Sequence, residues 1–167
     1  MIEEVIQKKV VYRTNYTGDT SIIDSHNHHL CSFDKGRVIS NRGGYQSNDI
    51  TFGYQDLIAF IINSFSLINK KATLINFWLN INKGIDFNTP HIHNMNIFSA
   101  VYYHKVCCDK SPLVFSDLVP TVLNWTYPIF PKNQEIVLFD STIPHSVAPC
   151  NNHNHERISI AFNFAIL

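Results

Sequence analysis

Two histidines, His91 and His93, stand two residues apart in the segment TPHIHNMNIF, directly before a stretch with the pattern of a β-strand. Side chains at positions i and i+2 of a strand point to the same face. The two imidazoles can therefore offer nitrogen ligands to one metal ion. The chain contains 9 histidines, so this spacing needs support from residues further along the chain.

A third imidazole, His145, stands in the segment STIPHSVAP. A ligand from a distant strand would complete one face of a metal ion and leave the opposite face open for a substrate and oxygen. Non-haem iron sites have this arrangement, usually with two histidines and one carboxylate. The three histidines His91, His93 and His145 therefore predict an iron site.

A carboxylate-binding strand is predicted by the segment RISIAFNF, in which Arg157 and Ser159 alternate with apolar residues. Alternation places Arg157, Ser159, Ala161 and Asn163 on one face and Ile158, Ile160, Phe162 and Phe164 on the other. The polar face makes sense if it lines a pocket. Arginine forms charge-assisted pairs with carboxylates, and serine adds one hydrogen bond. The pocket would suit a small dicarboxylate.

Each of these residues also has an ordinary structural interpretation. His91 and His93 could be surface histidines where a loop meets a strand, and Arg157 could pair with Glu135. The segment IIDSHNHHL resembles the opening of metal-dependent amidohydrolases, but those enzymes need a barrel of about 250 residues. We therefore expect a flexible loop there, near the substrate entrance, and a polar hairpin turn at NNHNHE, residues 151–156.

The elements that must position these residues are mostly strands. Residues 54–69 carry apolar residues at helical spacing and predict one helix. Residues 1–13 predict an edge strand, and residues 14–52 are polar and rich in turn formers. Five segments with strand character follow the helix: ATLINFWLNIN, IFSAVYYHK, PLVFSDL, EIVLFDS and RISIAFNFAIL. Because no crossover helices separate them, the pattern predicts an antiparallel sandwich or barrel.

Length and charge limit the class of protein further. A chain of 167 residues with 45% hydrophobic residues predicts one domain over residues 1–167. Residues 1–70 would supply a strand, a loop and a helix, and residues 71–167 the core strands that carry the site. With 13 basic and 13 acidic residues the net charge is zero, so neither nucleic acid nor a membrane surface is expected as a partner.

Cysteine usage and the absence of long apolar segments predict the compartment. Cys31, Cys107, Cys108 and Cys150 form no Cys-x-x-Cys motif, so we expect reduced thiols in the cytoplasm. The start of the chain, MIEEVIQKKV, does not predict a signal peptide. No run of about 18 apolar residues predicts a membrane-spanning helix.

The ordered motifs of the chain resemble one enzyme family, the Fe(II)/2-oxoglutarate-dependent oxygenases, which have a double-stranded β-helix or jelly-roll fold. The resemblance covers roughly residues 43–164, including GGYQSN at 43–48. The blocks that carry it are WLN (78–80), HIH (91–93), SAVYY (99–103), PLVFSD (112–117), HSVAP (145–149) and RISIAFN (157–163). It implies a mainly β jelly-roll or cupin-like fold with an N-terminal helical segment.

The resemblance also implies roles for individual residues. His91, His93 and His145 would bind Fe(II), and Arg157 with Ser159 would hold the distal carboxylate of the co-substrate 2-oxoglutarate. Asn80 and Tyr103, or Tyr102 in its place, would be further donors, because the strand register decides which tyrosine faces the pocket. The implied reaction consumes O2 and 2-oxoglutarate, releases succinate and CO2, and hydroxylates an unactivated C–H bond.

The chain departs from the family at one ligand. Most members have Asp or Glu where His93 stands, so the site lacks one negative charge and should bind a divalent metal more weakly. A carboxylate from elsewhere, such as Asp86 or Asp117, is an alternative ligand. The implied function is an iron- and 2-oxoglutarate-dependent hydroxylase.

Two other functions stay open at this stage, and so does the substrate. The chain could be a three-His iron dioxygenase that needs no 2-oxoglutarate, or a non-catalytic cupin-like metal-binding domain. A peptidyl residue such as proline is the preferred substrate by analogy. Loops 24–48 and 104–111 are expected to determine specificity.

Overall fold

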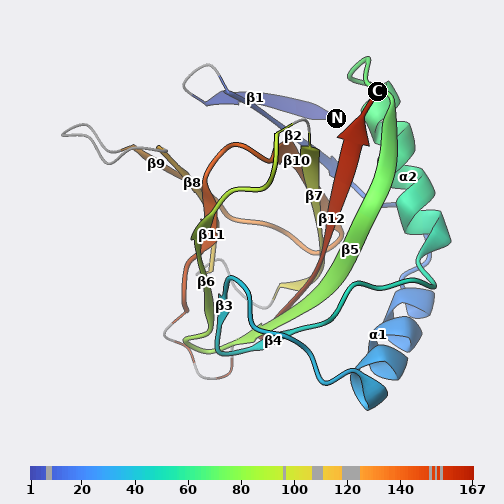
Figure 1. The fold of residues 1–167 in the computed structure, drawn as a ribbon, viewed down its shortest axis with the longest axis vertical. Coiled ribbons are helices and arrows are strands. Elements are labelled where there is room, and N and C mark those ends of the chain that lie inside the picture. Colours follow the sequence, from blue (N-terminus) through green and yellow to red (C-terminus); the bar gives the residue numbers. More distant parts are fainter. Residues whose placement is uncertain are drawn as a thin grey trace.

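Two antiparallel sheets form the framework of the protein, and two helices cover the outer face of the larger sheet in the computed structural model (Figure 1). The structure describes residues 1–6, 9–95, 97–106, 111–117, 125–150, 152, 154 and 156–167. The helices are α1, Ser21–Phe33, and α2, Gln55–Ser66.

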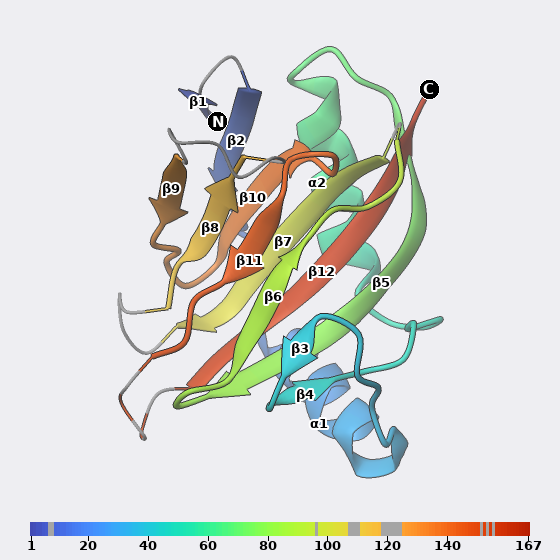
Figure 2. The same cartoon turned by 60° about the vertical axis from the view of Figure 1, so that its left-hand side comes forward.

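The larger sheet has seven strands in the order β1-β2-β10-β7-β12-β5-β4, and the smaller has five in the order β3-β6-β11-β8-β9. The bounds in the larger sheet are β1 Ile2–Ile6, β2 Lys9–Asn15, β4 Tyr45–Gln46, β5 Ala72–Lys83, β7 Ile97–Val106, β10 Glu135–Asp140 and β12 Glu156–Ile166. Those in the smaller sheet are β3 Asn41–Arg42, β6 Phe87–His91, β8 Leu113–Ser116, β9 Thr126–Ile129 and β11 His145–Val147. The two sheets face each other (Figure 2), which confirms the predicted mainly β jelly-roll fold.

Strand β12 lies between β7 and β5 in the larger sheet, and its register aligns the two neighbours. Ser159 pairs with Asn80 on β5 and with Tyr103 on β7. Arg157 pairs with Asn82 on β5. Because paired residues of adjacent strands place their side chains on the same face, this register gathers polar side chains on the inner face of the sheet.

The outer face of the larger sheet is apolar and packs against α2, which lies within the helix predicted over residues 54–69. Leu57, Ile61 and Phe65 are the buried apolar residues of the helix. The same core cluster contains the outward residues of two strands: Phe77, Leu79, Ile160, Phe162 and Phe164. The predicted alternation of RISIAFNF is confirmed, because its apolar side chains face the helix.

Two predictions for the N-terminal region are wrong. Residues 21–33 form helix α1 and not a flexible loop, because Ile23, Asn27 and Leu30 share a buried face and Tyr54 Oη donates to Asn27 Oδ1 at 2.8 Å. The single edge strand predicted over residues 1–13 is a hairpin, in which β1 pairs with β2 from Ile2–Arg13 to Ile6–Lys9.

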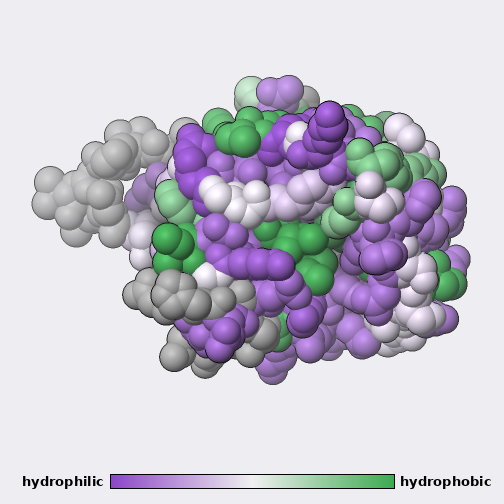
Figure 3. Space-filling model, turned by 90° about the horizontal axis from the view of Figure 1, so that it is seen from below, coloured by the Kyte–Doolittle hydropathy of each residue, from purple (hydrophilic) through white to green (hydrophobic). Residues whose placement is uncertain are grey.

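The space between the sheets holds a second core and, beside it, the polar pocket described below. Val137 and Phe139 of β10 are buried with Phe115 of β8 and Ile129 of β9. From below, the surface is mostly hydrophilic, with hydrophobic residues visible at its centre (Figure 3). Neither of the described helices has the length and apolar character needed to cross a bilayer.

Candidate functional site

Three histidines converge at one end of the space between the sheets. His91 is the last residue of β6 and pairs in register with His145, the first residue of β11. His93 lies just beyond β6, where its backbone N–H donates to the Ser141 carbonyl at 2.9 Å. One potential ligand atom from each histidine lies within 4.8 Å of the other two, and no other His, Cys, Asp or Glu of the described residues joins the group.

Hydrogen bonds fix the tautomer of all three imidazoles. His91 Nδ1 lies 2.8 Å from the Thr89 carbonyl, and His145 Nδ1 lies 2.9 Å from the Ile143 carbonyl. His93 Nδ1 lies 2.7 Å from Asn163 Oδ1. Since each partner is an acceptor, each Nδ1 carries the proton and donates it. The Nε2 lone pairs remain for a metal ion, which is the usual state of histidine ligands.

Burial keeps these imidazoles neutral. It lowers the pKa of His145 to about 3, with a smaller contribution from neighbouring His91. Burial also lowers the pKa of His91, and that of His93 despite the opposing hydrogen bond with Asn163. Only the neutral imidazole can bind a metal ion, so the arrangement suits an iron ligand set.

Across the pocket lies a buried cation. Arg157 is only 2% exposed, and burial lowers the pKa of its guanidinium. Its Nη1 donates to the Ser111 carbonyl at 3.1 Å and its Nη2 to Asn82 Oδ1 at 3.4 Å, whereas its buried Nε has no partner. Among the described residues no carboxylate pairs with it. A buried charge without a counter-ion is costly, so the geometry suits an anionic ligand.

Arg157 does not pair with Glu135, the carboxylate that the sequence offered as its partner. Glu135 instead pairs with Arg13, whose Nη2 lies 2.7 Å from Glu135 Oε1. The structural interpretation of Arg157 as half of a Glu135 ion pair is therefore wrong.

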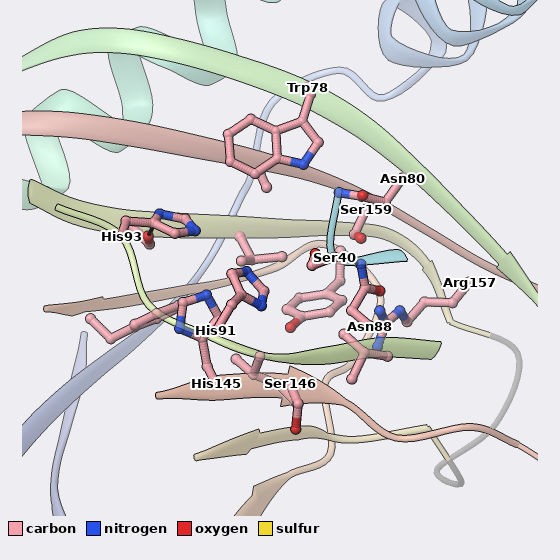
Figure 4. Close-up of a pocket in the computed structure, with 17 residues that line it drawn as sticks. Ser40, Trp78, Asn80, Asn88, His91, His93, His145, Ser146, Arg157 and Ser159 are labelled. Atoms are coloured by element: carbon pink, nitrogen blue, oxygen red, sulfur yellow. Dashed lines mark hydrogen bonds between the residues drawn. The ribbon is translucent and has the colours of Figure 1, made fainter. Parts of the chain in front are cut away.

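A pocket connects the histidines to Arg157, and we call it the inner pocket. It encloses about 510 Å³ of empty space, mouth included. Asn80, Tyr103 and Ser159 are among its lining residues. Figure 4 shows the three histidines on one side, Arg157 on the opposite side, and Ser159 and Asn80 along the wall between them. The structure thus brings together all seven residues predicted for the site.

The register of the strands determines that Tyr103, and not Tyr102, faces the inner pocket. Tyr103 lines the inner pocket, with the Arg157 guanidinium carbon 5.8 Å from its ring centroid. Burial raises the pKa of Tyr103 to about 12, so its hydroxyl stays protonated and can donate. Tyr102 faces the opposite side of the sheet, where its ring centroid lies 5.6 Å from that of Tyr16.

Amide side chains that the sequence did not single out support Arg157. Asn82 Nδ2 donates to Asn88 Oδ1 at 3.3 Å, and Asn88 Nδ2 donates to Ser40 Oγ at 3.1 Å. The only signal in the sequence was the position of Asn82, two residues after Asn80 and therefore on the same face of β5.

A second amide network starts at His93. Asn163 Oδ1 accepts from His93, and Asn163 Nδ2 donates to Asn76 Oδ1 at 3.0 Å. Asn76 Nδ2 donates to Asp49 Oδ2 at 3.0 Å, and Asp49 Oδ1 accepts from Arg37 Nη2. A carboxylate paired with an arginine thus ends the chain of hydrogen bonds that orients His93.

A more open cavity adjoins the inner pocket, and we call it the outer pocket. It contains about 780 Å³ of empty space, mouth included. Both pockets share the residues Ser40, Trp78, His91 and His93. The remaining lining of the outer pocket is Arg37, Ile39, Gln46, Asn76, Thr89, Ile92 and Asn163. A ligand there would lie next to two of the histidines.

Several predicted residues lie elsewhere or outside the described residues. Neither Asp86 nor Asp117 joins the histidines; Asp86 Oδ2 accepts from the Lys83 backbone N–H at 2.7 Å. In the predicted turn 151–156, residues 151, 153 and 155 lie outside the described residues, as do Cys107, Cys108 and the rest of 107–110 in the predicted loop. Of the other two cysteines, Cys31 is exposed and Cys150 is buried.

Comparisons with known proteins identify the class. Residues 76–163 match the model of a family described as "Putative 2OG-Fe(II) oxygenase". This match contains the three histidines and Arg157. The chain belongs to the 2OG-Fe(II) oxygenase family, as its motifs predicted, and its cofactors are those of the family, Fe(II) and 2-oxoglutarate. No curated protein gave a significant match.

Solved structures share the fold at low sequence identity. A prolyl-4-hydroxylase from Pseudomonas putida is 13% identical with a TM-score of 0.62, over 93% of this chain and 91% of that one. HygX from Streptomyces hygroscopicus, with nickel, 2-oxoglutarate and hygromycin B bound, is 8% identical with a TM-score of 0.68, over 93% and 82%. A prolyl hydroxylase from Trichoplax adhaerens, in complex with a peptide fragment of hypoxia inducible factor, is 18% identical with a TM-score of 0.63, over 92% and 83%.

Proposed function

We propose that this oxygenase holds Fe(II) with His91, His93 and His145 and hydroxylates its substrate while 2-oxoglutarate is converted to succinate and CO2. The observation that carries the proposal is the pair of features on opposite sides of the inner pocket. Three neutral imidazoles converge with their Nε2 atoms unused, and a buried guanidinium without an acid partner faces them.

The residues of the inner pocket would hold 2-oxoglutarate between these two features. Arg157 pairs with the distal carboxylate, which supplies the missing counter-ion. Ser159, Tyr103 and Asn80 offer hydrogen bonds along the same wall. Bound Fe(II) supplies the activation of oxygen on which the chemistry depends.

The protein's own contribution is orientation and shielding. Nδ1 hydrogen bonds hold each imidazole in one tautomer. Leu113 of β8 and Phe139 of β10, both members of the second core, give the inner pocket an apolar wall, which would limit the access of water. Most family members have an Asp or Glu at the position of His93, and no described carboxylate supplies that negative charge here. The site should therefore bind its metal more weakly than a site with two histidines and one carboxylate.

A peptidyl residue, proline among the candidates, is our proposed substrate. The support is modest: two of the structures with this fold are prolyl hydroxylases, although at identities of 13% and 18%. We also propose a reducing compartment, the cytoplasm, because Fe(II) must stay reduced. Nucleic acid is not proposed as a substrate, because the chain has zero net charge.

The experiment that tests the proposal measures succinate. Protein purified without metal is given Fe(II), O2 and 2-oxoglutarate, and succinate is measured over time with and without a pool of proline-containing peptides. We expect slow succinate formation even without peptide, which requires both Fe(II) and 2-oxoglutarate. His145→Ala should abolish it by loss of the metal, and Arg157→Met should abolish it while Mn(II) binding persists.

The same measurements separate the two alternatives. Oxygen consumption without succinate would indicate a three-His dioxygenase that needs no 2-oxoglutarate. A non-catalytic metal-binding domain would consume neither oxygen nor 2-oxoglutarate, and Arg157→Met would not change its ligand binding.

A further inference from the structure

The hydrogen bonds that lead from His93 to Asp49 all run in one direction. His93 Nδ1 lies 2.7 Å from Asn163 Oδ1. Asn163 Nδ2 donates to Asn76 Oδ1 at 3.0 Å, and Asn76 Nδ2 donates to Asp49 Oδ2 at 3.0 Å. Each amide thus accepts on the side of the histidine and donates on the side of the carboxylate.

The backbone holds the members of this chain in line. Asn163 on β12 pairs in register with Asn76 on β5, so the two amides lie on the same face of adjacent strands. The backbone N–H of Ile50, the residue after Asp49, donates to the Phe77 carbonyl on β5 at 2.8 Å. The sheet therefore places the carboxylate beside the first amide.

The carboxylate determines the direction of the chain. An amide side chain can turn over and exchange its oxygen and its NH2 group, whereas an ionised carboxylate only accepts. Asp49 therefore requires the NH2 group of Asn76 and leaves the Asn76 oxygen for Asn163. Asn163 must then donate to Asn76, which leaves its own oxygen for His93. Arg37, which only donates, binds the other oxygen of Asp49.

The second neighbour of His93 Nδ1 does not select a tautomer. Ser99 Oγ lies 3.1 Å from this nitrogen and 2.9 Å from Ser141 Oγ. A hydroxyl both donates and accepts, so Ser99 can serve either tautomer of the imidazole. The oxygen of Asn163 only accepts, so it requires the proton on Nδ1 and leaves the Nε2 lone pair for a metal ion.

His93 needs this control more than the other two histidines do. His91 and His145 donate from Nδ1 to backbone carbonyls, which cannot exchange an oxygen for a donor. The partner of His93 is an amide side chain that can. A carboxylate ligand, which most family members have at this position, has no tautomer to control. The histidine at this position therefore depends on whatever fixes the amide of Asn163.

The charge of Asp49 contributes less than its direction. Its side chain is 43% exposed and pairs with Arg37, so water and the guanidinium screen the charge. Two amides also separate it from His93. The chain therefore transmits the order of donors and acceptors rather than a negative charge.

We propose that Asp49 is a positioning residue for the iron site and that it sets the tautomer of His93 through Asn76 and Asn163. The inference rests on the proposed function, because it assumes that His93 binds the metal through Nε2. It adds a residue that touches neither the histidines nor either pocket's shared wall.

The test determines the tautomer of His93 in metal-free protein. Long-range ¹H–¹⁵N correlation spectra of ¹⁵N-labelled protein distinguish the protonated from the unprotonated nitrogen of each imidazole. In the wild type we expect the proton of His93 on Nδ1. Asp49→Leu removes the acceptor that ends the chain, so a second population with the proton on Nε2 should appear for His93 alone. His91 and His145 should keep the proton on Nδ1 and thereby report that the variant is folded.

A double variant keeps the direction of the chain while it moves the carboxylate. In the combination of Asp49→Asn with Asn76→Asp, the amide at position 49 can accept from Arg37 and donate to the carboxylate at position 76. That carboxylate accepts from Asn163, so every donor keeps its direction. His93 should therefore keep its wild-type tautomer, which a merely structural role of Asp49 would not predict.

The affinity for Mn(II), measured by isothermal titration calorimetry, gives a second readout. It should fall about 3- to 10-fold in Asp49→Leu, less than for a direct partner of a metal-binding histidine. In the double variant it should stay within about threefold of the wild-type value. Asp56→Leu removes the same charge at an exposed position of α2 and should bind Mn(II) as the wild type does.

The outcomes separate this inference from the proposed function. A proton that stays on Nδ1 of His93 in Asp49→Leu overturns the inference, and so does a changed tautomer in the double variant. If Asp49→Leu also alters His91 and His145, Asn76→Leu decides by the same spectra, because it breaks the chain at its middle. Wild-type protein that binds no Mn(II) overturns the proposed function, whereas the tautomers are measured without metal and still decide whether Asp49 controls His93.

Discussion

His93 and Asn163 lie 70 positions apart in the sequence, and a hydrogen bond of 2.7 Å joins His93 Nδ1 to Asn163 Oδ1. Asn163 Nδ2 donates to Asn76 Oδ1, so the amide oxygen, and not the nitrogen, faces the imidazole. His93 is the ligand at which the chain departs from the family's carboxylate. The orientation of this ring therefore depends on an amide of β12, together with the Ser99 hydroxyl, which lies 3.1 Å from the same nitrogen.

Asn163→Leu removes the shorter of two hydrogen-bond contacts of His93 Nδ1, at similar side-chain volume, and leaves the contact with Ser99 Oγ at 3.1 Å. We expect the affinity for Mn(II), a redox-stable substitute for Fe(II), to fall about 10- to 100-fold, because partners that orient metal-binding histidines typically contribute that much. Asn163→Asp should keep most of the affinity, since a carboxylate accepts the same hydrogen bond. Isothermal titration calorimetry measures both values.

The control for this series is Asn63→Leu on the exposed face of α2, which should bind Mn(II) as the wild type does. Wild-type affinity in Asn163→Leu would show that the amide does not position His93.

Asn82→Asp should weaken the binding of 2-oxoglutarate, because the new carboxylate would pair with Arg157. Asn82 Oδ1 already lies 3.4 Å from Arg157 Nη2, so an aspartate there would supply the counter-ion that the guanidinium lacks. The co-substrate would then compete with a permanent ion pair. We expect 2-oxoglutarate affinity to fall by about 100-fold or more, given the free energy of buried ion pairs, while Mn(II) affinity stays within about threefold.

Two measurements check this prediction. Calorimetry gives the affinity, and the rise in unfolding temperature on adding 2-oxoglutarate should be smaller in Asn82→Asp than in the wild type. Asn63→Asp, which adds the same charge on the exposed helix face, should leave both values unchanged. A full thermal response in Asn82→Asp would show that Arg157 is not where the co-substrate's carboxylate binds.

The sequence could predict those parts of the site that follow from the alternation of polar and apolar residues along one strand. RISIAFNF has bulky apolar residues at every second position, so the face of Arg157 and Ser159 followed directly from the period of a strand. The choice between Tyr102 and Tyr103 did not follow, because it depends on the register between β7 and β12.

The features that the sequence did not predict depend on contacts between distant segments of the chain. In IIDSHNHHL, polar residues obscure the helical spacing, and α1 becomes recognisable only when Tyr54 binds Asn27. The amides Asn76, Asn82 and Asn163 look like ordinary polar residues in the sequence. Their roles arise from partners on other strands, which a single sequence does not reveal.

Phe65→Ala should destabilise the fold strongly. Phe65 is fully buried, and its ring centroid lies 5.0 Å from that of Phe164 on β12. Replacing a buried phenylalanine by alanine typically costs about 3–5 kcal/mol, so we expect a loss of that size in the free energy of unfolding measured with urea. Leu67→Ala, at a position that is 72% exposed, should cost less than about 0.5 kcal/mol. Equal stability of the two variants would mean that α2 does not hold the outer face of the sheet.

Asp34 should make the wall of the outer pocket sensitive to acid. Its carboxylate accepts from the Gly36 N–H at 2.5 Å, from Tyr45 Oη at 3.1 Å and from Asn48 Nδ2 at 3.2 Å. These bonds tie together the two ends of residues 34–48, the segment that carries Arg37 and Gln46. Burial alone would raise the pKa of Asp34, but the hydrogen bonds outweigh it and lower the pKa below its ordinary value of 3.8.

The sign of the pH effect follows from this lowered pKa. A carboxyl group whose pKa is lower in the folded than in the unfolded state stabilises the fold above the unfolded value, and the contribution is lost as the pH falls through the folded value. Asp34→Asn should therefore lower the unfolding temperature at pH 7, and the gap to the wild type should narrow below about pH 4. Circular dichroism melts between pH 7 and pH 2.5 measure the gap. A gap that stays constant over this range would mean that the charge of Asp34 does not hold residues 34–48 in place, and the wall of the outer pocket would then depend on its neutral hydrogen bonds alone.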